Sequence, residues 1–530
     1  MGGSALPAAA GRPRPTSAAA AQRASAMSGW WPLLAITVLA AVLRLSTLGL
    51  QSFWYDEAFT PVHVLRAGLG ATLHNVVHTE NTPPLWYVLE WAVSRVLGTG
   101  VIALRLLSAL AGIATVPVAW AIGCEFQGPP TRRAAIVAAA LVASSPLLVW
   151  YSQEARAYGL FVLTASLALL CFVRALREPT GRRLAAFALT ASLALLTHYF
   201  AVFLLVPMAL WLVGSAAPKG SRGKLAPQER TANPKKDLPR VLCAVALPVL
   251  VGMALIPLIL AQGAHGTQWI GESALASRLE AIPQYYLTGY TGAALGHGVE
   301  LLVLLVILAG FGYGLWSTLT PREERGALIV LTVAGAGVLI PVVLAVLGAD
   351  YLAPRNLVAA MAPVSALLAI VIAAQRTGRV GMGLATLLVL TLLALTIDVN
   401  LSPRLQRGDW AGVATVLRAA QPDHVITTVE LGAAPLEYYL PPLRNLARGS
   451  SVTVTEVDET GYAPLRKSAS RPPAPGFRLS ERRNIHGLIV YRFTSSAPVT
   501  ISEEVLREHV ITIAQHPEVL VRASSTGKTI

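Results

Sequence analysis

Long runs of apolar residues, separated by short polar segments, occupy most of the chain between residues 30 and 400. A helix of about 20 apolar residues crosses the ~30 Å apolar core of a membrane. We therefore predict a polytopic α-helical membrane protein with about eleven transmembrane helices. The predicted spans are 30–50, 101–122, 133–150, 157–175, two within 184–213, 241–262, 299–318, 326–347, 356–374 and 380–400.

The run 184–213 is broken only at Thr197-His198-Tyr199, and basic loops flank it at 174–183 and 215–240. Basic loops prefer the cytoplasm, so both flanks belong on one side of the membrane. The run should then cross twice, as two helices of about 15 residues, or about 22 Å each. We predict a helical hairpin with His198 and Tyr199 at its outer turn.

The segment 51–100 is polar, contains several aromatic residues, and forms the first predicted outer loop. Thr82, Pro83 and Pro84 form a helix-start signal, with Thr82 as the expected N-cap. The residues that follow, 85–98, mix Trp, Leu and Val with two charged residues. They favour a helix lying in the membrane interface.

The last 130 residues lack the long apolar runs of the preceding chain. Residues 409–418 have the pattern of an amphipathic helix, and 425–430, 452–457 and 488–493 have the pattern of strands. We predict a small α/β domain over 401–530, with a loop at 466–483. With the N-terminal tail (1–29) disordered and cytoplasmic, an odd number of crossings places this domain outside. The transmembrane domain then covers 30–400, and we expect no cleaved signal peptide.

The composition agrees with a cell-membrane protein and argues against a nucleic-acid-binding protein. Hydrophobic residues make up 54% of the chain and charged residues 13%, against about 25% charged in soluble proteins. The formal net charge of +14 comes from short loops between spans, which is the positive-inside pattern. We therefore expect membrane lipids, and no nucleic acid, as partners of these loops. The three cysteines form no metal-binding motif.

The unusual polar residues all fall on the predicted outer side, where ionisable groups are costly and usually line a site or pair with each other. They are Asp56, Glu57, His78, Glu80, Gln153, Glu154, Arg156, His198, Tyr199 and Arg355. Simpler roles exist for some: Asp56-Glu57 as a helix N-terminus, Glu154 and Arg156 as a structural ion pair, His198-Tyr199 as an interface anchor. Arg355 opposes the charge bias of outer loops, and its planar donors suit a phosphate.

The order and sidedness of these motifs resemble the C-type integral-membrane glycosyltransferases (GT-C). The similarity is to the family of protein O-mannosyltransferases and bacterial lipid A aminoarabinose and galacturonosyl transferases. Two departures are Thr82, where the family often has His, and Arg355-Asn356, where it usually has Arg-Tyr. The matching segments are WYDEAF (54–59), TENTPPLWY (79–87), LRLLSALAG (104–112), YSQEARAY (151–158), THYF (197–200), PRN (354–356) and DWAGVATVLR (409–418).

The resemblance implies sugar transfer from a polyprenyl-phosphate donor to an envelope glycan, lipid or protein at the outer face of the membrane. It assigns Asp56 as the catalytic carboxylate, Glu57 as its companion and Arg355 as the ligand of the donor phosphate. The residues implied to bind the donor or shape its site are Glu80, Gln153, Glu154, Arg156, His198 and Tyr199.

The residues also suit an inverting transfer on chemical grounds. A carboxylate can take the proton of the acceptor hydroxyl, and a fixed arginine can stabilise a phosphate leaving group. This scheme requires no cofactor. A divalent metal remains possible, held by Glu80 with His78 or His198.

Two other functions fit a membrane protein of this kind. A transporter or flippase of lipid-linked sugars would place charges near the bilayer midplane and often contains internal repeats, and we find none. A non-catalytic assembly protein would bind a cell-wall polymer through its outer domain. Loss of sugar transfer in an Asp56→Asn variant separates the enzyme from both.

Overall fold

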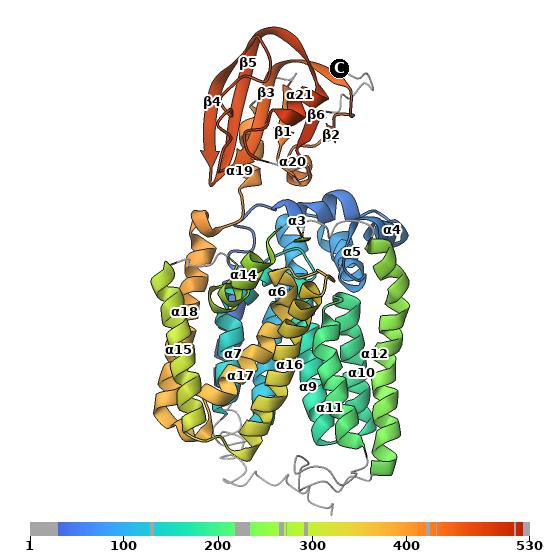
Figure 1. Ribbon diagram of the computed structural model, residues 1–530, viewed down its shortest axis with the longest axis vertical. Helices are drawn as coiled ribbons and strands as arrows, with labels where there is room; N and C mark the ends of the chain where they lie inside the picture. The colour runs from blue at the N-terminus through green and yellow to red at the C-terminus, as the bar shows by residue number, and fades with distance from the viewer. Residues whose placement is uncertain are drawn as a thin grey trace, which may run out of the picture.

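The computed structural model describes residues 30–127, 132–217, 234–263, 270–271, 273–290, 295–419, 424–430, 432–513 and 516–522. These residues form a helical bundle with a separate α/β domain seated on one end of it (Figure 1). The predicted tail 1–29 and much of the basic loop 215–240 lie outside the described residues.

Each predicted span contains a helix. In the described residues, seven helices are long and apolar enough to cross a membrane, or eight if the bent pair α7–α8 is one span. The chain is therefore a multi-pass membrane protein, and the count of about eleven stays a prediction. The helices are α2 (Trp31–Leu45), α6 (Val101–Phe126), α7 (Arg133–Ser144), α8 (Pro146–Ser152), α9 (Tyr158–Arg177), α10 (Gly181–Thr197), α11 (Ala201–Ala216), α12 (Pro234–Gln262), α15 (His297–Trp316), α16 (Pro321–Val346), η2 (Pro354–Ala360), α17 (Met361–Ile372) and α18 (Gly378–Leu401).

The predicted helical hairpin at 184–213 is confirmed. Helix α10 ends at Thr197 and α11 begins at Ala201, so His198 and Tyr199 lie in the turn between them. The backbone N–H of His198 still closes the last turn of α10 on Ala194 (3.0 Å), after which the chain reverses. The hairpin end therefore carries polar side chains at the same level as the other polar loops.

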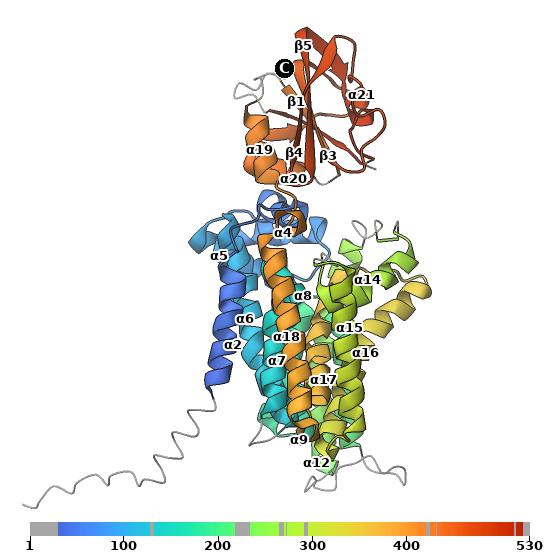
Figure 2. The ribbon, with the colours of Figure 1, turned by 90° about the vertical axis from the view of Figure 1, so that its left-hand side faces the viewer.

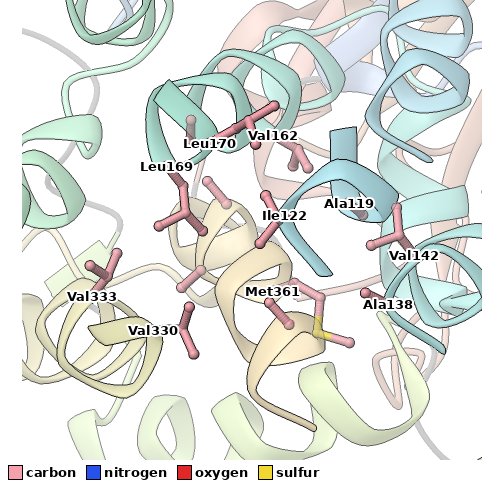
Figure 3. Close-up of a cluster of buried hydrophobic side chains, with 14 of the residues drawn as sticks. Ala119, Ile122, Ala138, Val142, Val162, Leu169, Leu170, Val330, Val333 and Met361 are labelled. Carbon is pink, nitrogen blue, oxygen red and sulfur yellow. The ribbon is translucent and has the colours of Figure 1, made fainter. Parts of the chain in front are cut away.

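Small residues hold the centre of the bundle together. A Cβ added at Gly123 of α6 would lie 2.5 Å from the Cα of Ala135 in α7, so the two helices pack backbone to backbone. Figure 3 shows α6, α7, α9, α16 and α17 meeting in this core, with Ala138 and Met361 among its side chains. Close packing between small residues is the usual source of helix association inside a membrane. This core fixes the helix ends that carry the site.

Four short elements between α2 and α6 cover the end of the bundle below the α/β domain (Figure 1). The helix predicted over 85–98 is confirmed as α5, and its place in the membrane interface stays a prediction, but Thr82 is not its N-cap. Pro84 occupies that position, and the Thr82 hydroxyl lies 3.1 Å from the Tyr87 hydroxyl instead. Helix α4 was not predicted from the sequence. The four elements are α3 (Tyr55–Phe59), η1 (Thr60–Val64), α4 (Leu69–Thr79) and α5 (Leu85–Leu97).

A longer connection, α14 (Leu275–Thr288), lies at the same end of the bundle between α12 and α15 (Figures 1 and 2). Its Arg278 pairs with Asp350 through two contacts of 2.7 and 2.6 Å. This pair fixes α14 against the segment that leads into η2.

The C-terminal domain is a six-stranded sheet in the order β2-β6-β1-β3-β5-β4. Strands β1 and β3 are parallel, and the other neighbours are antiparallel. Helices α19 and α20 bury one apolar cluster against the sheet, and α21 belongs to a second. The elements are α19 (Trp410–Arg418), β1 (His424–Thr428), α20 (Ala433–Tyr439), β2 (Leu443–Asn445), β3 (Ser451–Tyr462), β4 (Phe477–Ile485), β5 (Leu488–Ser502), α21 (Glu503–Glu508) and β6 (Glu518–Arg522).

The α/β class, the helix at 409–418 and the three predicted strands are confirmed. The loop predicted at 466–483 is wrong at its end, because β4 begins at Phe477. Strand β4 forms one edge of the sheet, and arginines occupy several of its positions. Charged side chains are common on edge strands because they discourage pairing with other chains, and here they conceal the strand pattern.

The C-terminal domain contacts the bundle through α20 and the segment before α3. The hydroxyl of Tyr439 accepts a hydrogen bond from the backbone N–H of Phe53 (2.8 Å), and the hydroxyl of Tyr438 donates to the carbonyl of Thr99 (2.9 Å). Trp54 enters the same apolar cluster as Trp410. Figure 2 shows the domain directly above these elements.

Candidate active site

A cavity of about 870 Å³ opens at the end of the bundle that carries the C-terminal domain. Its long wall is apolar and comes from α10, α11, α12 and α16, with Phe203, Val249 and Ile256 among its side chains. Its other end is polar. The polar residues that line it are Tyr55, Asp56, Thr79, Glu80, Asn81, Thr82, Arg156, Tyr158, His198, Tyr199, Gln262, Tyr351, Arg355, Asn356 and Glu430.

Asp56 and Arg355 face each other at the polar end. Arg355 Nη1 donates to Asp56 Oδ2 at 2.6 Å, and both side chains are about one-fifth exposed. Asp56 lies in the first turn of α3, and Arg355 opens η2, so two separate parts of the chain meet here. The pair presents a carboxylate and a guanidinium to the same cavity.

Glu80 and Arg156 form a second pair on the cavity wall. Arg156 Nη1 lies 3.0 Å from Glu80 Oε2, which also accepts a short hydrogen bond from the Tyr87 hydroxyl. The other carboxylate oxygen of Glu80, Oε1, is buried without a hydrogen-bond partner among the described residues. An unpartnered buried oxygen is costly, which suits a position that meets a ligand.

Glu57 has a different environment from its neighbour Asp56. It is fully buried, does not line the cavity, and forms a two-pronged pair with Arg105 of α6 at 2.7 and 2.6 Å. It also accepts from the backbone N–H of Ala155 at 2.9 Å. Burial by itself raises the pKa of Glu57, but Arg105 outweighs it and holds that pKa below its usual value. Glu57 therefore fixes α3 in place while Asp56 faces the cavity.

Gln153 and Glu154 also lie behind the cavity wall. The side-chain amide of Gln153 donates to the carbonyls of Leu43 and Arg44, both at 3.1 Å. Glu154 is fully buried and pairs with Arg407 at 3.1 Å. Burial raises the pKa of Glu154 to about 7, against the opposing charge of Arg407.

His198 and Tyr199 line the cavity from the hairpin turn. The ring of His198 stacks on Phe161 with centroids 4.6 Å apart, and its Nδ1 accepts from the backbone N–H of Phe200 at 3.2 Å. The Tyr199 hydroxyl donates to Gln262 of α12 at 2.7 Å. These contacts fix the turn as one side of the cavity.

Part of the chain matches a known enzyme family. Residues 81–225 match the family model for dolichyl-phosphate-mannose-protein mannosyltransferase. No curated protein sequence matches the chain.

Most of the chain resembles a solved structure in its fold. ArnT from Cupriavidus metallidurans in the apo state superposes with a TM-score of 0.53 at 12% identity, over 88% of this chain and 98% of ArnT. The same enzyme bound to undecaprenyl phosphate gives a TM-score of 0.52, with the same identity and coverage. The chain has the fold of the GT-C membrane glycosyltransferases.

A third GT-C structure is similar over part of its length. The oligosaccharyltransferase of Archaeoglobus fulgidus, solved with zinc and sulfate, gives a TM-score of 0.46 at 15% identity. That match covers 77% of this chain, which spans 57% of the oligosaccharyltransferase.

Within this GT-C fold, the structure brings together six of the predicted site residues. Asp56, Glu80, Arg156, His198, Tyr199 and Arg355 line the one cavity. Glu57, Gln153 and Glu154 do not line it and support the residues that do.

Sequence reasoning missed several residues of the site. Arg105 lies inside a long apolar helix, and such an intramembrane charge is a signal we did not use. Arg407 and Glu430 come from the C-terminal side, and no sequence pattern ties them to the first loop. Glu430 follows β1 and lines the cavity from the C-terminal domain, so both parts of the molecule form the site.

The residues of the predicted metal site, Glu80 with His78 or His198, each make other contacts. The ring of His78 contacts that of His74 in a tilted arrangement, with centroids 4.4 Å apart, and Glu80 pairs with Arg156 and Tyr87. In the part of the chain that the structure describes, no three His, Cys, Asp or Glu side chains are grouped to hold a metal ion.

Proposed function

We propose that the protein transfers a sugar from a polyprenyl-phosphate donor to an acceptor hydroxyl, with inversion at the anomeric carbon. The observation that carries this proposal is the two-part cavity, apolar along α10, α11 and α12 and charged where Asp56 meets Arg355. A donor of this class has the same two parts, a long hydrocarbon chain and a phosphate-linked sugar.

The donor would lie with its prenyl chain along the apolar wall and its phosphate at Arg355. A guanidinium is always charged, and its planar donors match phosphate oxygens. Without donor, Arg355 pairs with Asp56. A bound phosphate would compete for Arg355 and weaken that pair, which makes Asp56 a better proton acceptor only when the donor is in place.

The reaction then needs one base and one group that stabilises the leaving phosphate. The acceptor oxygen attacks the anomeric carbon from the face opposite the phosphate, and its proton passes to Asp56. The bond between that carbon and the phosphate oxygen breaks, and polyprenyl phosphate leaves with the bonding electrons. Arg355 stabilises its developing charge, and we assign the incoming proton to Asp56 Oδ1, because Arg355 binds Oδ2.

The remaining predicted residues have supporting roles in this proposal. Glu80 and Arg156, with His198 and Tyr199, bound the space for the donor sugar. Glu57, Gln153 and Glu154 hold the backbone behind it. The acceptor is an envelope glycan, a lipid or a protein, and it would enter from the side of Glu430.

The deciding experiment uses purified full-length protein and radiolabelled polyprenyl-phosphate sugars. Asp56→Asn keeps the shape of the side chain but removes the base, so transfer should fall by about 10²- to 10⁴-fold. Asp237→Asn is the matched control, because Asp237 lies in the first turn of α12, about 37 Å of helix from Gln262 at its other end. Near-normal transfer by Asp56→Asn would overturn the assignment of the base. If Asp56→Asn abolished translocation of the lipid-linked sugar and not sugar transfer, the result would favour a flippase.

The proposed orientation in the cell membrane places the N-terminus in the cytoplasm and the C-terminal domain outside. In a variant without its three native cysteines, Ser496→Cys in the C-terminal domain should react with an impermeant thiol reagent added to whole cells. Ser221→Cys, in the basic loop between α11 and α12, should react only after the membrane is opened. Labelling of Ser221→Cys in intact cells would reverse the topology.

A further inference from the structure

Arg407 lies in the short segment that joins the bundle to the C-terminal domain, between α18 and α19. Its side chain is buried, at 1% exposure, and its guanidinium stacks on the ring of Trp150 at 4.0 Å. Its Nη2 donates to Glu154 and to the carbonyl of Trp150, both at 3.1 Å. A linker residue therefore reaches into the bundle directly behind the cavity.

The same linker holds the segment that leads to Asp56. The backbone N–H of Arg407 donates to the side chain of Gln51 at 3.0 Å, and the carbonyl of Gly408 accepts from the Ser52 hydroxyl at 3.1 Å. Arg105 holds the opposite side of this segment, donating to the carbonyls of Gln51 and Ser52. The backbone before α3 is thus clamped between α6 and the linker.

Glu57 lies between the two arginines. Arg105 contacts both of its oxygens, and Arg407 Nε lies 3.9 Å from its Oε2. With Glu154, the group contains two buried carboxylates and two buried guanidiniums, so its formal charges balance. Glu154 Oε1 and Arg407 Nε nevertheless have no hydrogen-bond partner among the described residues. A buried network with unsatisfied atoms is a poor source of stability, so its geometry calls for another explanation.

We infer that Arg407 is a positioning residue for the active site. Through Arg407, the position of the C-terminal domain on the bundle determines the position of Asp56. The side-chain contacts that carry this inference are those to Glu154 and Trp150 on one side and, from Nη1 at 3.4 Å, to Gln51 on the other. The C-terminal domain then acts as a structural part of the catalytic site. The test of this inference by sugar transfer rests on the proposed function, whereas its test by amide hydrogen exchange does not.

Arg407→Gln alone leaves Glu154 buried without its cation and will lower the melting temperature. The informative variant is the double substitution Glu154→Gln with Arg407→Gln, which removes both charges and restores the balance. We expect it to recover the melting temperature while kcat for sugar transfer stays about 100-fold low, because a displacement of about 1 Å costs that much. The donor KM should change less than twofold, since Arg355 and the apolar wall are untouched.

Two further variants complete the set. Arg407→Lys keeps the positive charge but lacks the planar donors of arginine. We expect it to recover the melting temperature, whereas kcat should stay about tenfold below wild type. A tenfold loss is about the effect of losing one hydrogen bond to a charged group. Arg404→Gln is the matched control, because Arg404 lies on the same linker but its side chain is 71% exposed. It should leave kcat, KM and the melting temperature unchanged.

Amide hydrogen exchange of residues 51–57 provides a readout that does not depend on the reaction. The double variant should exchange these amides faster than wild type at equal overall stability, and Arg404→Gln should not. Recovery of both stability and kcat by the double variant, or unchanged exchange at 51–57, would show Arg407 to be only a counter-charge and overturn the inference. Faster exchange in a protein that transfers no sugar even as wild type would retain Arg407 as a positioning residue and reject the proposed function.

Discussion

Arg355 and Asp56 are 299 residues apart in the chain, yet Arg355 Nη1 donates to Asp56 Oδ2 at 2.6 Å. Asp56 comes from the five-residue helix α3, which follows α2, and Arg355 comes from the 3₁₀ turn η2, which precedes α17. The pair links the proposed base to the proposed phosphate ligand. A change at either residue therefore alters the other.

Arg355→Lys tests the phosphate-binding role. Lysine keeps the positive charge but lacks the planar donors that bind two phosphate oxygens at once. We expect kcat/KM to fall by about 10- to 100-fold, mainly through a higher donor KM. Transfer kinetics over a range of donor concentrations measure this. Arg376→Lys is the control, because Arg376 is exposed and bonds to Thr318 instead. An unchanged donor KM in Arg355→Lys would contradict the assignment.

Glu57→Gln tests whether Glu57 is structural. The substitution leaves the buried guanidinium of Arg105 without its counter-charge, and breaking a buried pair costs about 3–5 kcal/mol. Denaturant unfolding in detergent measures the loss of stability. Glu125→Gln is the comparison, because Glu125 pairs with Arg174 and Arg177, whose side chains are about half exposed, and should cost less than about 1 kcal/mol. Equal effects from the two variants would show that Glu57 does not anchor α3.

Ala209→Phe tests the proposed path of the prenyl chain. Ala209 lies on the apolar wall of the cavity, so a phenyl ring there would fill space that a long chain needs. We expect donors with long prenyl chains to lose affinity by about tenfold, roughly 1.4 kcal/mol, while short-chain donors are used normally. Transfer from a series of donors of different chain length measures the change. Leu210→Phe, at the adjacent exposed position, should leave the series unchanged. A uniform effect on all donors would place the chain elsewhere.

Glu459 in the C-terminal domain predicts a pH dependence of stability. Burial raises its pKa to about 7, against the opposing effect of His509, whereas an unfolded glutamate titrates near about 4.3. Between these values the folded state holds a proton that the unfolded chain has released. The free energy of unfolding should therefore fall as the pH rises from about 4.5 to 7, by up to about 3 kcal/mol.

His509 adds to this dependence in the same direction. Burial acts to lower its pKa, but its hydrogen bond to Glu459 outweighs burial and raises it, so its contribution is present at low pH and lost as the pH rises. Amide exchange of the C-terminal domain at pH 5 and pH 8 measures the effect in the full-length protein. Glu459→Gln should reduce the pH dependence, and Glu504→Gln, at an exposed position, should not. An unaltered slope in Glu459→Gln would assign the effect to other groups.

The sequence alone determined the long apolar helices of this protein and three of its strands. Long apolar runs predict helices because each must bury its backbone polar groups within itself inside a membrane. Charge bias around 184–213 predicted the helical hairpin, and alternation predicted three strands of the C-terminal domain. These signals are local, so they are readable without partners. Local signals did not reveal β4 and α4, because the polar residues of these two elements make contacts with other parts of the fold.

Only the tertiary structure decided which carboxylate faces the cavity and what holds it there. Asp56 and Glu57 are neighbours with the same chemistry, but a helix turns successive side chains by about 100°. One therefore reaches the cavity and Arg355, while the other points into the bundle towards Arg105. The linker residue Arg407 behind them is set by how the C-terminal domain sits on the bundle. Ion pairs between distant segments depend on distance and burial in space, and neither is encoded in a local pattern.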